Sequence, residues 1–175
     1  HPYAQTKVAV EQMLNALCRS SQWKVINLRY FNPVGAHPSG RIGEDPLGTP
    51  NNLFPYITQV AAARRDKLKI FGNNYKTIDG TGIRDYLHVM DLAEAHEKAL
   101  QHLKNQHPFY STTIHIGTGQ SLCVMEVFKG FETSTGVSIP YEIVSRRDGD
   151  VDKLEACPRK AEEVLGWKAT RSLND

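Results

Sequence analysis

The feature that most constrains the fold of this chain is a repeated alternation of helix-like and strand-like hydrophobic patterns along its 175 residues. Apolar residues recur at helical spacing in several segments, and short apolar runs lie between them. Helices are predicted at residues 4–19, 53–64, 91–103, 124–133 and 158–165, and strands at 24–30, 67–71, 83–89, 112–116 and 139–144. This alternation predicts an α/β architecture, in which helices pack on a mostly parallel sheet.

Composition and charge exclude several classes of protein. Hydrophobic residues make up 40% of the chain and charged residues 23%, as in ordinary globular proteins. The formal net charge is only +2 and the basic residues are scattered, so we expect no nucleic-acid partner. No apolar run is long enough to span a membrane. Cys18, Cys123 and Cys157 lack metal-ligand or redox-pair spacing, and the histidines lack metal spacing, so we expect reduced thiols, no metal and a cytoplasmic location.

Tyr3 and Lys7 are the candidate catalytic residues, because they lie four positions apart at the start of the first predicted helix. Side chains at this spacing share one face of a helix. A lysine ammonium near a phenol favours the phenolate, so such a tyrosine can take a proton from a sugar hydroxyl. Alone, the pair is weak evidence, because Tyr-x-x-x-Lys also occurs as a chance surface pair.

Several polar residues have the chemistry to bind a ligand, and open α/β proteins bind ligands where strand ends face a crevice. Asn32 and Asn52 can bond sugar hydroxyls or phosphate oxygens, although asparagine also stabilises ordinary turns. Arg84 and Arg147 suit a diphosphate, because a guanidinium binds phosphate bidentately. The alternative for each arginine is a surface ion pair.

Three further residues have both a ligand-binding and a structural interpretation. Asp150 could accept hydrogen bonds from ribose hydroxyls, or it could be a turn residue. Phe71 and Tyr86 could stack on a uracil ring, or they could belong to the core. The run Gly117-Thr118-Gly119 lacks the third glycine of a dinucleotide fingerprint, so it is interpreted as a tight strand-to-helix connection.

Five ordered segments carry a family resemblance that covers nearly the whole chain. They are Arg29-Tyr30-Phe31-Asn32-Pro33-Val34-Gly35-Ala36-His37-Pro38-Ser39-Gly40, Gly43-Glu44-Asp45-Pro46, Pro50-Asn51-Asn52-Leu53, Asp79-Gly80-Thr81-Gly82-Ile83-Arg84-Asp85-Tyr86-Leu87-His88-Val89 and Arg146-Arg147-Asp148-Gly149-Asp150. With Tyr3 and Lys7, they closely resemble the UDP-galactose (UDP-glucose) 4-epimerases of the extended short-chain dehydrogenase/reductase family. Chance agreement of five segments in order is very improbable.

The resemblance implies a fold and a reaction. The expected fold is the end of a Rossmann-like doubly wound parallel sheet plus a smaller mixed α/β substrate-binding domain. Residues 1–32 would end the NAD-binding domain, and residues 33–175 would largely form the UDP-sugar-binding domain, with some segments returning to the Rossmann sheet. The implied isomerase interconverts UDP-galactose and UDP-glucose in galactose metabolism, with hydride passing from C4 to NAD and back to the 4-keto sugar. A homodimer is also implied, through the first helix.

The resemblance also implies roles for individual residues. Tyr3 would be the acid/base, and Lys7 would bind the nicotinamide ribose and lower the pKa of Tyr3. Both would contact the cofactor, together with Tyr30 and Phe31. The UDP-sugar site would be lined by Asn32, Asn52, Leu53, Lys69, Phe71, Arg84, Tyr86, Arg147 and Asp150. Leu154 lies where some members carry a bulky tyrosine, so we expect some tolerance of UDP-N-acetylglucosamine.

Two family features are absent from the sequence, namely the glycine-rich cofactor loop and the catalytic Ser or Thr upstream of the Tyr–Lys pair. The sequence also leads from His1 directly into a helical pattern, with no strand before it. We therefore expect the chain to be the C-terminal portion of a longer protein, and by itself to neither retain NAD nor turn over substrate. Two alternatives remain, another NAD-dependent sugar-nucleotide epimerase or dehydratase, and a non-catalytic UDP-sugar-binding fragment.

Overall fold

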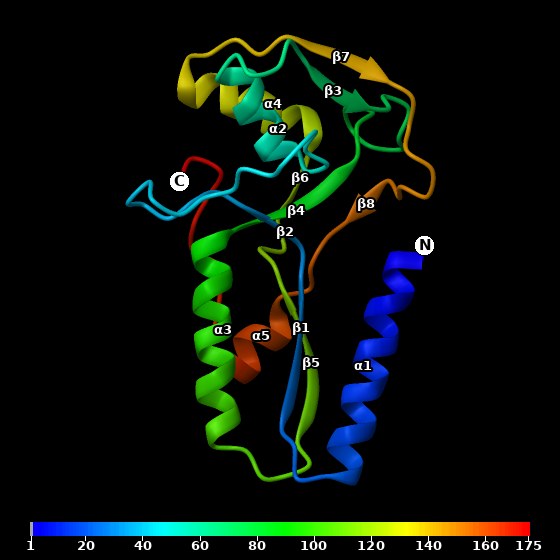
Figure 1. Cartoon of the computed structure of the whole chain (residues 1–175), viewed down its shortest axis with the longest axis vertical. Coiled ribbons are helices and arrows are strands. Elements are labelled where there is room, and N and C mark those ends of the chain that lie inside the picture. The colour runs from blue at the N-terminus through cyan, green and yellow to red at the C-terminus, as the bar shows by residue number, and fades with distance from the viewer. Residues whose placement is uncertain (1) are drawn as a thin grey trace.

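The computed structural model describes residues 2–175 and has the predicted α/β architecture (Figure 1). In chain order the elements are α1 (Pro2–Ser20), β1 (Val25–Tyr30), β2 (Asn32–Val34), α2 (Leu53–Ala61), β3 (Leu68–Phe71), β4 (Ile83–His88), α3 (Val89–Lys104), β5 (Ser111–Ile116), β6 (Ser121–Cys123), α4 (Val124–Thr135), β7 (Tyr141–Val144), β8 (Lys153–Leu154) and α5 (Arg159–Leu165). No helix within residues 2–175 is long and apolar enough to cross a membrane.

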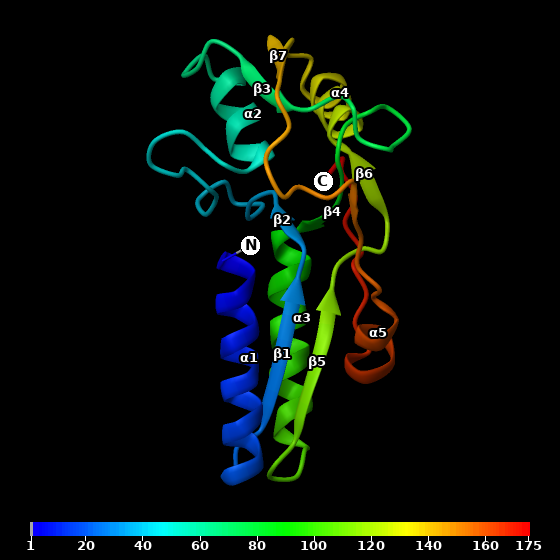
Figure 2. The same ribbon diagram turned by 90° about the vertical axis from the view of Figure 1, so that its right-hand side faces the viewer.

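The lower part of the molecule is a two-stranded parallel sheet with helices around it (Figures 1 and 2). β1 pairs with β5 from Val25 opposite Ser111 to Tyr30 opposite Ile116. The core beneath this sheet contains Ile114 and Ile116 from β5 and Trp167 after α5. It is extended by α3, whose Leu92, Ala95 and Ala99 recur at helical spacing and are buried. The pairing brings residues far from the N-terminus back to the first strand, although the domain division at residue 32 stays a prediction.

The upper part is a separate small α/β layer. β3 and β7 are parallel, with Leu68 opposite Tyr141, and α2 and α4 cover them. Its core is built from buried apolar side chains on α2, β3 and α4 and just before β7, namely Tyr56, Ile57, Val60, Leu68, Ile70, Phe128 and Ile139. This second core fixes the positions of the start of α2 and the end of β3, which both reach the junction between the two parts.

Short strands around β4 join the two parts. β2 runs parallel to the second half of β4, while β6 runs antiparallel and β8 parallel to its first half. The Asp85 side chain is fully buried at this junction. Its carboxylate accepts hydrogen bonds from the backbone N–H groups of Thr118, Gly119 and Ala156 at 2.9, 2.9 and 3.2 Å, and from the Thr118 hydroxyl at 2.7 Å. Asp85 therefore links β4, through hydrogen bonds, to the segments that precede β6 and follow β8.

The structure corrects the sequence-based prediction in three places. β2 lies at the start of the segment 32–51, which was expected to lack regular structure. β6 separates Gly119 from α4, so residues 117–119 do not connect a strand directly to a helix. β8 was not expected at all. These strands have two or three residues, which is too short for a period-two pattern, and they are defined by their pairing with β4.

Candidate functional site

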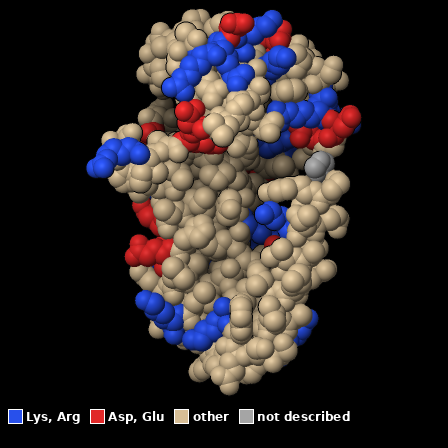
Figure 3. All heavy atoms as spheres, viewed as in Figure 1, with Lys and Arg blue, Asp and Glu red and all other residues tan. Residues whose placement is uncertain are grey.

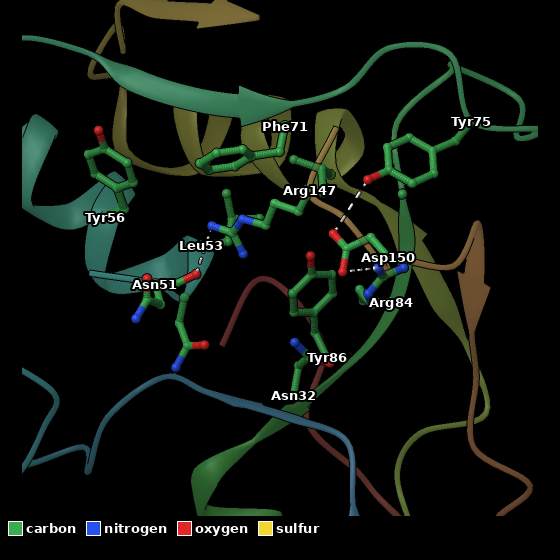
Figure 4. A pocket seen from close by; sticks show the side chains of 13 residues that line it. Asn32, Asn51, Leu53, Tyr56, Phe71, Tyr75, Arg84, Tyr86, Arg147 and Asp150 are labelled. Atoms are coloured by element: carbon green, nitrogen blue, oxygen red, sulfur yellow. Dashed lines mark hydrogen bonds and ion pairs between the residues drawn. The ribbon is translucent and has the colours of Figure 1, made fainter. Parts of the chain in front are cut away.

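The candidate site is a cavity of about 260 Å³ where the upper and lower parts meet (Figure 4). Its walls come from β2, the start of α2, the end of β3, β4, the start of α4 and the segment after β7. The lining residues are Asn32, Asn51, Asn52, Leu53, Tyr56, Phe71, Tyr75, Gly82, Arg84, Tyr86, Val124, Arg147 and Asp150. Carboxamides, two guanidinium groups and aromatic rings thus meet in one space.

Arg147 crosses this cavity from the segment that follows β7. Its guanidinium carbon lies 3.9 Å from the centroid of the Phe71 ring, which is a cation–π contact. Its Nη2 donates a hydrogen bond to the backbone oxygen of Asn51 at 3.3 Å. Figure 4 shows the guanidinium between the Phe71 ring and Asn51, where it can meet an anionic ligand.

Asp150 is the acidic residue of the cavity, and two partners hold its carboxylate. Oδ1 lies 3.6 Å from Nη2 of Arg84, and Oδ2 accepts a hydrogen bond from the Tyr75 hydroxyl at 3.4 Å. Nη1 of Arg84 also donates to the backbone oxygens of Ile83 and Val151 at 2.8 and 3.0 Å. Burial, followed by the Asp150 charge, raises the pKa of the Tyr75 phenol, which therefore stays a donor.

Tyr86 stands between the main cavity and a neighbouring one of about 160 Å³. Burial raises the pKa of its phenol to about 12, although the nearby Arg84 charge acts in the opposite direction. The smaller cavity is also lined by Phe31, Asn32, Asn52 and Leu53, so Phe31 lies near the main cavity without lining it.

Tyr3 and Lys7 line a different cavity, of about 540 Å³, between α1 and β1. Nζ of Lys7 lies 5.3 Å from the centroid of the Tyr3 ring, so the two side chains share one helix face as predicted. Tyr30 lines the same cavity, and Arg29 pairs with Glu11 at its wall, with 2.7 Å between Nε and Oε1. The N-terminal end of α1, which carries Tyr3, is the end nearest the junction (Figures 1 and 2).

Most of the residues assigned to the UDP-sugar site from sequence lie in the main cavity, and two do not. The cavity contains Asn32, Asn52, Leu53, Phe71, Arg84, Tyr86, Arg147 and Asp150. Lys69 is exposed on β3, where its side chain points away from the buried Leu68 and Ile70. Leu154 is 46% exposed on β8, opposite Arg84 in the sheet, and does not line the cavity.

Five lining residues were missed by the sequence analysis, namely Asn51, Tyr56, Tyr75, Gly82 and Val124. Asn51 and Gly82 lie within two of the segments that carry the family resemblance, so both could have been found from the sequence. Tyr75 lies in a polar segment with no periodicity, and Tyr56 and Val124 belong to the first turns of helices. Only the three-dimensional arrangement reveals these three.

Residues 117–119 cannot hold a pyrophosphate in this arrangement. The N–H groups of Thr118 and Gly119 already donate to the Asp85 carboxylate. A Cβ atom at Gly117 would lie 2.4 Å from Cβ of Ala156, so this glycine is needed for close packing. This agrees with the interpretation that the run is not a dinucleotide fingerprint.

Comparison with known proteins gives the family. The model of the NAD dependent epimerase/dehydratase family matches residues 1–117. The chain belongs to this family. Among curated members of the NAD dependent epimerase/dehydratase family, UDP-glucose 4-epimerase of Bacillus subtilis is 50% identical over 176 residues, and the human enzyme is 48% identical over 175. These alignments cover 100% and 99% of this chain but 51% and 50% of the relatives, so the chain spans about half their length.

Two solved structures that are similar to this chain are also UDP-glucose 4-epimerases. UDP-glucose-4-epimerase from Stenotrophomonas maltophila, with bound NAD and formylated UDP-arabinopyranose, has a TM-score of 0.95 and 50% identity. UDP-glucose 4-epimerase from Bifidobacterium longum, in complex with NAD+ and UDP, has a TM-score of 0.94 and 43% identity. Each match covers 100% of this chain and 52% of the solved chain. The position of this segment within a longer protein stays a prediction.

Proposed function

We propose that this chain supplies the UDP-sugar pocket and the Tyr–Lys pair of a UDP-glucose 4-epimerase, an isomerase that interconverts UDP-galactose and UDP-glucose. One observation carries the proposal. Eight residues assigned to the UDP-sugar site, spread from position 32 to position 150, line a single cavity. Relatives with about 50% identity bear the same enzyme name.

The chemistry of the cavity suits each part of a UDP-sugar. Arg84 and Arg147 provide positive charge for the diphosphate, and the Arg147 guanidinium can also bind it bidentately. The Phe71 ring, on which Arg147 now stacks, offers a face for uracil. Asp150 is an acceptor for ribose hydroxyls, and Asn32 and Asn52 can bond the sugar or the phosphates.

Tyr3 and Lys7 fit the proton-transfer part of the reaction. A phenol one helical turn from an ammonium group can hold a proton or release it to a sugar oxygen. Together with Tyr30, these residues suit the nicotinamide–ribose end of NAD, and the cavity beside them has room for it. NAD, when bound, supplies the hydride acceptor. Among the described residues, the glycine run at 117–119 does not fit its pyrophosphate, since its N–H groups are engaged.

We further propose that the intact protein is a cytoplasmic homodimer that pairs through α1. Val8, Val10, Met13 and Leu17 of this helix are 40–65% exposed. Figure 3 shows that most charged side chains in this view gather over the upper part, while the α1 side is largely uncharged. Three free cysteines suit a reducing compartment.

Isothermal titration calorimetry of the chain with UDP tests the main proposal. All residues of the proposed UDP site lie within this chain, so we expect UDP to bind, and CDP and inorganic phosphate to bind more weakly. Failure of UDP to bind to folded chain contradicts the proposal. UDP-galactose turnover, assayed on the same sample, is expected to be absent without the missing cofactor loop.

A second candidate function, non-catalytic UDP-sugar binding, is favoured by the occupied N–H groups of residues 118 and 119. Equilibrium dialysis with NAD, followed by a turnover assay, separates the two. Retention of NAD by the chain alone argues against a binding module, whereas UDP binding without NAD retention is the result expected for either. Turnover after an NAD-binding segment of a relative is added in trans then favours the enzyme.

A further inference from the structure

Tyr75 lies in a tightly folded loop between β3 and β4. Its side chain is only 5% exposed although the loop is polar. The Tyr75 N–H donates to the backbone oxygen of Gly80 at 2.9 Å, which closes the loop. Gly80 has a φ of +80°, and a Cβ there would lie 2.4 Å from the Asn73 oxygen, so the loop needs glycine at this position. The position of the Tyr75 ring is thereby fixed.

Arg146 covers one face of the Tyr75 ring. Its guanidinium carbon lies 3.8 Å from the ring centroid, and its Nη2 donates to the backbone oxygen of Asp150 at 2.9 Å. A Cβ atom at Gly72 would lie 2.6 Å from Cγ of Arg146 and 2.7 Å from Cε2 of Tyr75. The absence of a side chain at position 72 therefore permits this stack.

The Tyr75 hydroxyl and Arg84 hold opposite oxygens of the same carboxylate. Tyr75 donates to Oδ2 of Asp150 at 3.4 Å, and Arg84 lies 3.6 Å from Oδ1 (Figure 4). An ionised carboxylate has about four acceptor positions. Each oxygen therefore keeps capacity for another donor. The Asp150 side chain is 37% exposed, and it lines the cavity.

We propose that Tyr75 is a positioning residue, which orients the Asp150 carboxylate so that it accepts a hydrogen bond from a ribose hydroxyl of the bound nucleotide. The inference rests on the proposed function, since it assumes that UDP occupies this cavity. It assigns to Tyr75 a role that acts through Asp150. Arg146 supports the Asp150 carboxylate indirectly, because it stacks on the Tyr75 ring and bonds the backbone oxygen of Asp150.

The test compares UDP with 2′-deoxy-UDP and 3′-deoxy-UDP in calorimetric titrations of the chain. Wild type is expected to prefer UDP over at least one analogue by about tenfold, the size of one hydrogen bond to a charged group. Tyr75→Phe keeps the ring but loses the hydroxyl, so this preference should fall to roughly threefold, while affinity for that analogue changes by less than about twofold. A purely structural role would weaken UDP and analogue equally.

Two further variants complete the design. Arg146→Met keeps a side chain over the Tyr75 ring but removes the donor to the backbone oxygen of Asp150. It should also lower the preference for UDP over the deoxy analogue. This variant keeps the positioning role testable if Tyr75→Phe does not fold. Tyr141→Phe removes a hydroxyl from a 45% exposed tyrosine on β7 and should change neither affinity.

The possible failures can be told apart. If wild type binds UDP and the analogues equally, or if Tyr75→Phe leaves the preference unchanged, the positioning role is wrong and the proposed function stands. If wild type binds no UDP, the proposed function is contradicted, and this inference with it.

Discussion

Replacing Asp85 with Asn should destabilise the chain, because this carboxylate is an acceptor for four donors in a fully buried place. Asn has nearly the same shape, but one of its two polar atoms is a donor. In the better orientation the amide oxygen replaces Oδ2 and keeps the N–H groups of Gly119 and Ala156. The amide nitrogen then faces the Thr118 N–H, whose distance to the present acceptor is 2.9 Å.

The magnitude follows from these contacts. The Thr118 N–H loses its acceptor, and the two retained bonds lose a charged acceptor, which makes bonds roughly twice as strong as neutral ones. Net values of about 1.5–3 kcal/mol for a bond to a charged group, and about 1–3 kcal/mol for an unsatisfied buried donor, give a total near 3 kcal/mol. This is a large part of the 5–15 kcal/mol that typically stabilises a domain, on the order of a third.

Urea denaturation followed by tryptophan fluorescence measures the effect, because Trp167 is buried in the folded chain. With a typical slope of about 2 kcal/mol per molar urea, the midpoint should fall by roughly 1.5 M. Asp45→Asn is the matched control, because its carboxylate is 71% exposed and pairs with Arg64 at 3.3 Å, so its effect should stay within about 0.5 kcal/mol. If Asp85→Asn costs less than about 1 kcal/mol, the argument that Asp85 ties β4 to its neighbours is wrong.

Three other predictions concern the cavity. Burial raises the pKa of Tyr86 from 10.0 to about 12, so the protonated phenol contributes stability that is complete below pH 10 and is lost as the pH rises toward 12. Urea midpoints should therefore fall less steeply between pH 10 and 12 in Tyr86→Phe than in wild type. Equal slopes in the two proteins count against this expectation. Arg147→Lys should weaken UDP binding by on the order of tenfold in calorimetry, because lysine cannot bind phosphate bidentately, and an unchanged Kd contradicts that role. Leu154→Tyr should leave the binding of UDP-N-acetylglucosamine relative to UDP-glucose unchanged, because Leu154 is 46% exposed on β8 and does not line the cavity, and a fall in this ratio would return Leu154 to the substrate site.

The long elements could be predicted from the sequence, and the short pairings could not. Residues 91–103 carry apolar side chains at helical spacing over several turns, and α3 spans Val89–Lys104. By contrast, β8 has two residues that are exposed, and it exists because Lys153 and Leu154 pair with Ile83 and Arg84. Such a pairing joins positions about seventy residues apart, and no local pattern encodes it.

Prediction of the site residues from the sequence has the same limit. Arg147 and Asp150 were found through a family segment, and they line the cavity. Tyr75 was missed because its role depends on a closed loop and on Arg146 from a distant segment, which no periodicity records. Lys69 was assigned by resemblance, but it lies exposed two residues before Phe71 on the same face of β3, and only Phe71 lines the cavity.

Backbone amide shifts measured by NMR during a UDP titration show whether the cavity at the junction binds the UDP part of the ligand. We expect saturable shifts at Asn51, Asn52, Phe71, Arg147 and Asp150, which line the cavity. We expect little change along α1 beyond its first turn, because Lys7 and Val10 line the other cavity. Saturable shifts confined to α1 and β1, or no saturable shifts in folded protein, would contradict binding of UDP in this cavity.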